Sequence, residues 1–437
     1  MKKRVKVKNK VYGFLILVLI IILSIFFLLQ EKPKEKEIKK EPVISVKEQV
    51  LKKLPEEDPF FIEWIDANSQ DSMKKLLYLL ETTPYQEDMW HQVTGYSYQV
   101  LNDLYEKKYD SMDNVKVLDA NTNTISIVGD ISLADNWKIM PRYDASGKGV
   151  YGILSEEVVD IMKKSDLMIA NSEFTVSTRG TPMKGKQYTF RANPSRLSIY
   201  DEMGIDMVTL ANNHVYDYGK DAFLDMLSSF EEKGLPHIGA GRNLEEAMKP
   251  YYFIIGGYKF AFVNATRAEK YVLTPGATEN SEGVFRCYDP TNMINLIKSL
   301  RPDNDYVVAI IHFGWEDHHE LEQVQIDSSH MYIDAGADIV VGHHAHTLQG
   351  VEFYNHKPII YNLGDFIFSD NTDDTVIFQM TLKDDKTFDY KMIPGIHKNC
   401  YTTLYKDSEK QRVINNINSW SINAYLTEEG QILERNN

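Results

Sequence analysis

Short apolar segments alternate with amphipathic ones along residues 121–400, and this alternation restricts the fold more than any other feature of the sequence. TISIVGD at residues 124–130 is typical of a strand, and GKDAFLDMLSSFEEKG at 219–234 has helical spacing. The segment YYFIIGGYKFAFVNAT at 251–266 predicts an antiparallel hairpin that turns at Gly256 and Gly257. The alternation therefore predicts an α/β domain with added antiparallel strands.

Polar residues follow the carboxyl ends of five predicted strands, which is where ligands bind in open α/β sheets. These residues are Asp130, Glu173, Asn213 with His214, His312, and His344 with His346. Carboxylate, amide and imidazole groups without a thiolate suit Zn, Mn or Fe rather than a softer metal. We therefore predict a shared site for divalent metal ions. In GADIVVGHHAH, residues 336–346, two imidazoles are expected to bind two adjacent ions, and His343 to support them.

The segment at residues 11–29 contains 19 residues without a charge, which is long enough to cross a bilayer as a helix. A removed signal peptide is the alternative, but the segment is long for one and no A-x-A-like site follows it. We therefore expect a cytoplasmic tail at 1–10 and a single-pass anchor at 11–29. Six Lys/Arg in residues 1–10, against five in 31–40, favour an extracytoplasmic main body at the cell membrane.

The rest of the chain divides by composition. Residues 30–58 form a charged, Pro-containing stalk, residues 59–120 have helical spacing and are predicted to be a small helical spacer, and residues 401–437 follow the main domain as a C-terminal extension. The two cysteines, Cys287 and Cys400, are too few for a fold that depends on disulfides.

The charge distribution argues against a nucleic-acid partner. Residues 1–40 carry a net charge of +8, which leaves −23 for the remainder of a chain whose formal net charge is −15. Phosphate neutralisation dominates nucleic-acid affinity, so such an acidic body is a poor partner for it.

Six stretches in this chain resemble the CapA/PgsA family, the poly-γ-glutamate capsule biosynthesis proteins. These stretches are GDISL, ANSEFTV, LANNHVYDYG, IIHFGWED, GADIVVGHHAH and IIYNLGDFIF, which lie in the family's order between about residues 124 and 368. The family's domain is similar to the calcineurin-like metallophosphatases. The resemblance therefore implies a two-sheet sandwich flanked by helices in an α-β-β-α arrangement, with the active site at one edge.

The resemblance also implies a role for each matching residue. Glu173 stands where the metallophosphatases place the carboxylate that bridges two metals. The implied ligands are Asp130 and His346 for the first metal, and Asn213, His312 and His344 for the second. His214 would face the substrate as general acid or transition-state donor, beside Asn213. Asp217 and Asp365, like His343, are expected to support the ligands from behind.

This chain departs from both patterns. Metallophosphatases have Asp-x-His in the first motif, whereas Ser132 stands here in place of the imidazole. The first metal site is therefore expected to be the weaker one. Ala134, the Ser172–Glu173 pair, Ala345 and Asp365 also differ from the capsule family's usual residues. These changes preserve the metal donors but put the choice of substrate in doubt.

Two residues outside the ligand set are candidates for substrate binding. The Arg191 guanidinium suits an anionic group, with a surface ion pair as the equal alternative. Glu316 follows His312 and lines the predicted cleft, unless it belongs to a solvated loop.

Two functions remain open from the sequence. One is a membrane-anchored component of poly-γ-glutamate synthesis or export that works with membrane synthase or export subunits. The alternative is a metal-dependent phosphoesterase that acts on an anionic envelope substrate. A polyglutamate chain would be repelled by so acidic a body unless metals or local Lys/Arg reverse the field at the cleft.

Overall fold

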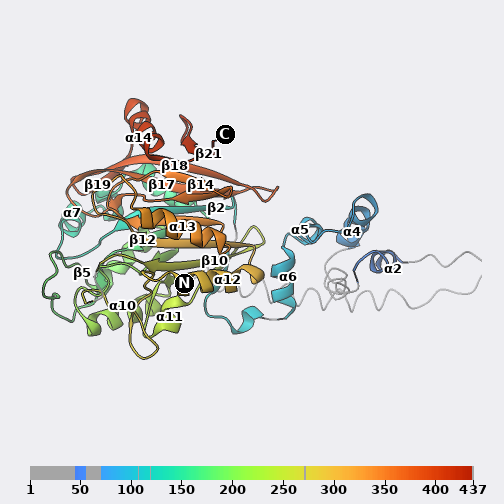
Figure 1. Cartoon of the computed structure of the whole chain (residues 1–437), viewed down its shortest axis with the longest axis horizontal. Helices are drawn as coiled ribbons and strands as arrows, with labels where there is room; N and C mark the ends of the chain where they lie inside the picture. The colour runs from blue at the N-terminus through green and yellow to red at the C-terminus, as the bar shows by residue number, and fades with distance from the viewer. Residues whose placement is uncertain (1–44, 56–69, 107, 119, 270–271, 436–437) are drawn as a thin grey trace, which may run out of the picture. The chain divides into compact units, whose positions relative to one another are not determined.

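The computed structural model describes residues 45–55, 70–106, 108–118, 120–269 and 272–435 (Figure 1). The chain divides into two compact units, Met1–Lys108 and Tyr109–Asn437. The predicted anchor at 11–29 lies outside the described residues. Within the described ranges, no helix is both long and apolar enough to cross a membrane.

The described part of the first unit is helical. Its helices are α2 (Val46–Leu51), α4 (Gln70–Thr82), α5 (Asp88–Thr94) and α6 (Tyr98–Tyr105). A capping box begins α2, in which the Ser45 hydroxyl accepts from the Glu48 N–H and the Glu48 carboxylate accepts from the Ser45 N–H. The unit has its own small core, made by Val50, Met73, Leu76, Met89, Trp90 and Leu101.

The second unit is built on two large sheets. The seven-stranded sheet has the order β1 (Val115–Val117), β9 (Tyr251–Ile255), β10 (Tyr258–Thr266), β12 (Tyr306–Phe313), β13 (Ile339–His344), β15 (Lys357–Ile360) and β14 (Val351–Tyr354). Its strands β10, β12, β13 and β15 run parallel, as strand–helix alternation requires. The predicted hairpin is confirmed, because β9 and β10 pair antiparallel across Gly256 (φ 56°) and Gly257 (φ 79°).

The ten-stranded sheet carries the other half of the parallel strands. Its order is β20 (Ala424–Leu426), β21 (Gln431–Glu434), β18 (Phe388–Lys398), β17 (Thr372–Leu382), β2 (Thr124–Ile131), β3 (Leu167–Ser172), β6 (Met207–Thr209) and β7 (His237–Ile238). Two further strands join it, β16 (Asp365–Ile367) on β2 and β19 (Tyr401–Leu404) on β18. Two small sheets pair β4 (Thr175–Val176) with β5 (Arg191–Ala192), and β8 (Ala240–Gly241) with β11 (Gly283–Val284).

Helices lie between these strands and around the sheets. They are α7 (Ile139–Ser146), α8 (Glu156–Lys164), α9 (Ser198–Met203), α10 (Lys220–Lys233), α11 (Leu244–Met248), α12 (Thr291–Leu300), α13 (Gln323–Asp334) and α14 (Asp407–Trp420), with 3₁₀ turns η1 (Lys108–Ser111), η2 (Gly149–Gly152), η3 (Pro194–Leu197) and η4 (Arg301–Asp303). Figure 1 shows α14 over the long hairpin of β17 and β18.

The two-sheet α/β sandwich predicted from the sequence is confirmed by which residues share a core. Along β12, Val308 and Ile310 pack into a central cluster with Ile127 of β2, while Ile311 packs into an outer cluster with residues of α12 and α13. Val128 of β2 points the other way, into a cluster with α8 and α10. Since side chains alternate faces along a strand, each sheet has one face toward the other and one toward helices.

The domain limits differ from those drawn on the sequence. Strand β1 pairs with β9, so residues 115–117 belong to the second unit although they precede the expected start at 121. The stretch expected to be an extension, 401–437, supplies β19, α14, β20 and β21, and its strands join the ten-stranded sheet. A three-residue strand has too short a pattern to be recognised without its partner.

Candidate metal centre

Three buried carboxylates come from the ten-stranded sheet. Asp130 lies at the end of β2, Glu173 directly follows β3, and Asp365 begins β16. Asp365 is the register partner of Asp130, because β16 pairs parallel with the last residues of β2. The Glu173 and Asp130 side chains have no solvent exposure.

The imidazoles come from the seven-stranded sheet. His312 lies near the end of β12 and His344 ends β13, with His346 two residues further on. His344 (φ 97°) and His346 (φ 55°) both have left-handed backbone conformations. These conformations are rare for residues with a Cβ and tend to persist where the surrounding structure and a site demand them. They turn the chain so that both rings reach the cluster.

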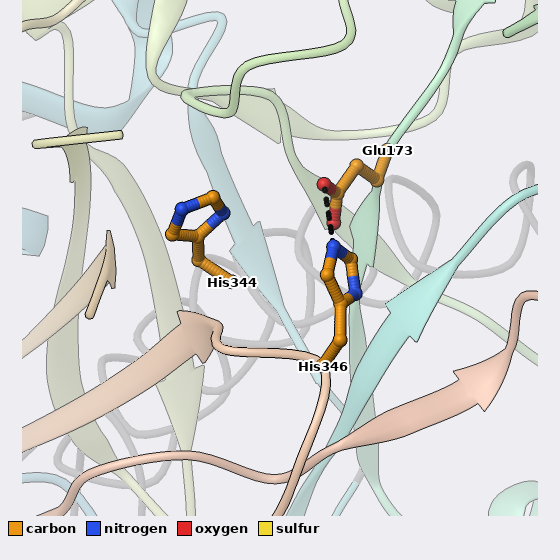
Figure 2. A group of neighbouring side chains, drawn as sticks. All are labelled: Glu173, His344 and His346. Carbon is orange, nitrogen blue, oxygen red and sulfur yellow. Dashed lines mark ion pairs between the residues drawn. The ribbon is translucent and has the colours of Figure 1, made fainter. Parts of the chain in front are cut away.

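The Glu173 carboxylate lies among three imidazole nitrogens without a hydrogen bond to any of them. Its buried Oε1 has no hydrogen-bond partner among the described residues. The Nε2 atoms of His312, His346 and His214 lie 3.6, 3.8 and 4.0 Å from it. Figure 2 shows the carboxylate with His344 and His346, whose ligand atoms all lie within 4.8 Å of one another.

These separations are too long for hydrogen bonds but suit ligands that share an ion, since metal–ligand distances are about 2.0–2.2 Å each. The buried residues therefore fit a metal ion.

Asn171 of β3 connects the cluster. Its Nδ2 lies 2.7 Å from Asp130 Oδ1, 3.0 Å from Glu173 Oε2 and 3.4 Å from His312 Nδ1. Its own Oδ1 accepts from Thr209 and Asn212, each at 3.1 Å. Asn171 thus holds two carboxylates in place, although it was not among the residues predicted from the sequence.

The loop after β6 brings an amide and a further imidazole. Asn213 Oδ1 lies 2.8 Å from His312 Nε2. His214 Nδ1 lies 2.7 Å from Asp217 Oδ2, which also accepts from the Phe190 N–H at 2.7 Å. With Nδ1 held by this carboxylate, the other ring nitrogen of His214 faces Glu173.

Electrostatics at the centre favour a cation. Burial raises the pKa of Glu173 well above its ordinary value, and the Asp130 charge raises it further. Burial also raises the pKa of Asp365 to about 7, against the opposing effect of His346.

The imidazoles differ in how readily they become protonated and offset the charge of the carboxylates. Burial lowers the pKa of His312 and of His344 well below the ordinary value, and neighbouring imidazoles lower both further. Burial also acts to lower the pKa of His346, but Asp365 and Glu173 outweigh it and leave that pKa well above its ordinary value. Three buried carboxylates thus face one readily protonated ring.

Three groups of side chains are arranged closely enough to hold an ion. They are Glu173 with His344 and His346, Asp130 with Glu173 and His312, and Asp130 with His346 and Asp365. Glu173 belongs to two of them, as a bridging carboxylate would. The groups cut across the expected division, since Asp130 pairs with His312 as well as with His346. Asp365 belongs to a group too, and its Oδ1 lies 2.7 Å from His346 Nδ1.

The remaining predicted residues lie at different distances from the cluster. The buried His343 directs Nε2 to the Val128 carbonyl at 3.0 Å, which ties β13 to β2. Glu316 is largely exposed, with Oε1 4.0 Å from His344 Nε2, so it borders the cluster. Arg191 donates to the Arg179 carbonyl at 2.8 Å and stacks 4.2 Å from the Tyr218 ring; none of its described contacts is with the cluster.

Lys186 is a second residue near the site that was not predicted from the sequence. Its ammonium group is buried beside the loop that carries Asn213 and His214. In the sequence it belongs to TPMKGKQYTF, whose turn-rich composition is that of a surface loop. No local pattern distinguishes it from the exposed Lys184 two residues earlier.

The fold and the cluster together define an α/β sandwich protein with a buried carboxylate–imidazole cluster that is arranged closely enough to hold a metal ion. The chain belongs to the bacterial capsule synthesis protein PGA_cap family, whose model matches residues 124–370.

Two curated relatives are similar over most of this region. The chain is 30% identical over 328 residues to the PGA biosynthesis protein CapA of Bacillus subtilis (strain 168), covering 73% of this chain and 83% of that protein. It is 29% identical over 281 residues to the capsule biosynthesis protein CapA of Bacillus anthracis, covering 62% and 66%. The solved structure of TT1561 from Thermus thermophilus aligns with 58% of this chain and 93% of its own, with a TM-score of 0.34 and 8% identity, a likeness too weak to inform fold or function.

Proposed function

We propose that this protein acts in the synthesis or export of a poly-γ-glutamate capsule, and that this role depends on a divalent-metal centre in its second unit. The names of the two CapA relatives, one for PGA biosynthesis and one for capsule biosynthesis, support the capsule part of the proposal. The carboxylate–imidazole cluster supports the metal part.

The observation that carries the proposal is the Glu173 Oε1 atom. A fully buried carboxylate oxygen without a hydrogen bond is costly, because its lost hydration is not replaced. Three imidazole nitrogens surround it at 3.6–4.0 Å, and Asp130 and Asp365 add negative charge nearby. A single divalent cation would bind the Glu173 Oε1 atom and offset the negative charge of the buried carboxylates.

A metal ion bound there would supply Lewis acidity and a water molecule of lowered pKa. The chain's own residues would do the rest. Asn213 Oδ1 is available as a neutral oxygen ligand beside His312. His214, oriented through Nδ1 by Asp217, can exchange a proton with a substrate at Nε2. The buried Phe190 ring packs 4.5 Å from the His214 ring and limits its movement.

The second candidate is a metal-dependent phosphoesterase that acts on a phosphorylated envelope substrate. The oriented His214 favours it, since a purely structural metal site has no need of a proton donor fixed by a carboxylate. The predicted metallophosphatase-like character of the fold belongs to this candidate. Mn, Zn or Fe remain the expected ions. Two are expected to bind, and the one at the first metal site, with Asp130 and His346 as ligands, is expected to be held more weakly.

We further propose that residues 11–29 anchor the protein in the cell membrane by a single pass, with the main body outside the cytoplasm. In that position the protein would meet the polymer and the membrane synthase or export subunits. Protease added to intact cells should then cleave the body, whereas complete protection would place it in the cytoplasm.

The experiment that tests the proposal measures bound metal and polymer in parallel. The wild type, Glu173→Gln and His214→Ala are each purified for metal analysis and expressed in a host lacking its own copy, where cell-associated polyglutamate is measured. Glu279→Gln is the matched control, because Glu279 is exposed and outside the cluster. We expect Glu173→Gln to lose both metal and polymer while the control keeps both.

His214→Ala separates the two candidates. It should leave the metal in place, because His214 belongs to none of the three ligand groups, although its ring is a neighbour of Glu173. A catalytic role predicts a loss of turnover of roughly 10²–10⁴-fold on a phosphoester substrate, whereas a scaffold keeps polymer output. Full metal content and full output in Glu173→Gln would contradict the proposed centre.

A further inference from the structure

Lys186 has its ammonium group buried where three loops meet. It lies in the loop between β4 and β5, and its side chain is only 3% exposed. Its Nζ lies 2.6 Å from Asp217 Oδ1 in the loop after β6 and 2.8 Å from Glu269 Oε2 in the loop after β10. It also donates to the Asn213 carbonyl. The ammonium thus donates hydrogen bonds to the Asn213 carbonyl and to Glu269, and forms an ion pair with Asp217.

The partners of Lys186 are themselves held firmly. The Thr274 hydroxyl lies 2.6 Å from Glu269 Oε2 and 2.9 Å from the Asn213 carbonyl. The Glu269 carbonyl accepts from the Tyr288 hydroxyl at 3.0 Å. Burying a lysine is costly unless it is paired and fully hydrogen-bonded. Here two carboxylates pair with the ammonium and two acceptors take its protons, so the lysine is held in place.

The two acceptors in the loop after β6 lead directly to the metal centre. Asn213 presents its backbone carbonyl to Lys186 and its side-chain oxygen to His312, 2.8 Å away. Asp217 presents Oδ1 to Lys186 and Oδ2 to His214, 2.7 Å away. One ammonium group therefore holds both ends of the five-residue segment that carries the amide and the imidazole.

We propose that Lys186 is a positioning residue of the centre. It sets the direction of the Asn213 amide through the backbone carbonyl, and the ring of His214 through Asp217, without contacting metal or substrate itself. The expected effect of Lys186 on metal affinity rests on the proposed metal centre. The orientation of His214 by Lys186 holds independently of any metal.

The test compares Lys186→Met, which removes the charge at similar length, with Lys186→Arg, which keeps it. Lys184→Met is the matched control, since Lys184 is exposed in the same loop. Mn²⁺ and Zn²⁺ alone are titrated into each metal-free protein by calorimetry, after thermal melts establish that it is folded. Residues that orient metal ligands typically contribute 10–100-fold in affinity. We expect Lys186→Met to weaken binding by about that factor, Lys186→Arg to recover part, and Lys184→Met to match the wild type.

A structural ion pair without a positioning role would give a different result. It would lower the melting temperature of Lys186→Met but leave the metal affinity of the folded protein unchanged, and that outcome would overturn the inference. If Lys186→Met does not fold, Glu269→Gln takes its place, because it loosens the same ammonium from the neighbouring loop. Wild-type affinity in that folded variant would overturn the inference equally.

A second readout needs no metal and separates this inference from the proposed function. In metal-free protein labelled with ¹⁵N-histidine, the His214 signals are identified by their loss in His214→Ala. We expect the wild type and Lys184→Met to show a proton on Nδ1 hydrogen-bonded to Asp217, and Lys186→Met to shift or lose that signal. If the wild type binds no metal, the proposed function fails, while this spectrum still tests Lys186. An unchanged His214 signal in Lys186→Met would overturn the positioning role.

Discussion

Glu173→Gln should be more stable than the wild type without metal, and less stable than the wild type when metal is bound. In the metal-free protein the Glu173 pKa is raised, first by burial and then by Asp130. An acid whose folded pKa is raised destabilises the fold once the pH exceeds its unfolded value, because ionisation then costs more in the folded state. The cost is about 1.4 kcal/mol for every tenfold weakening of the acid on folding. Glutamine removes this cost, so the metal-free variant should be more stable than the metal-free wild type at neutral pH.

Metal changes the sign of the comparison. A wild-type centre at 100-fold excess of ion over its dissociation constant gains about 2.7 kcal/mol. For a domain of this size the gain corresponds to a rise of roughly 5 °C in melting temperature. The variant should gain little, because it lacks the charge that the ion neutralises.

The assay is a pair of thermal melts for each protein, in chelator and in Mn²⁺ or Zn²⁺, with Glu279→Gln as control. The reasoning would be refuted if the metal-free variant were the less stable protein and both proteins gained equally from metal. That result would mean that Glu173 acts as an ordinary buried polar group.

Three further predictions concern the centre and the chain around it. Metal affinity should fall as the pH drops from 8 to 6, because Glu173 and Asp365 have raised pKa values and bind protons that compete with the ion. Calorimetry in buffers of different ionisation enthalpy should show that metal binding releases protons. Proton uptake on metal binding would contradict this prediction. Ser132→Ala should change the free energy of unfolding by less than about 0.5 kcal/mol in urea, since the buried Ser132 hydroxyl has no hydrogen-bond partner among the described residues; a loss above about 1.5 kcal/mol would show a bond that the structure lacks. A chain truncated to begin at residue 44 should be soluble and folded by circular dichroism, because the core clusters of both units lie beyond that point. An insoluble product would move the boundary.

Much of the site could be predicted because strand ends can be read from the sequence. Asp130, Glu173, His312 and His344 each follow or end an apolar strand, and parallel strands of a sheet place their carboxyl ends together. The packing of two sheets then brings these ends into one cluster. Neither step needs knowledge of any particular side-chain contact.

The residues that were missed depend on tertiary contacts. Asn171 lies within the strand sequence LMIANS and gives no signal of its own until Asp130 and Glu173 are beside it. Lys186 is buried only because loops from two other strands close over it. Arg191 was a candidate for substrate binding on its charge alone. Its guanidinium contacts the Tyr218 ring and the Arg179 carbonyl, which its charge does not predict.

The two sheets contribute different chemistry to the centre. All three carboxylates belong to the ten-stranded sheet or directly follow its strands, while the imidazoles of His312, His344 and His346 belong to the seven-stranded sheet or directly follow it. The sheets already meet here through the His344 N–H, which donates to Asp130 Oδ2 at 3.2 Å. An ion bound between them would cross-link the sandwich, so loading the centre and stabilising the fold would be one equilibrium. For that reason the reversal expected in Glu173→Gln tests the metal centre itself: a carboxylate that only packed between the sheets would change both melting temperatures in the same direction.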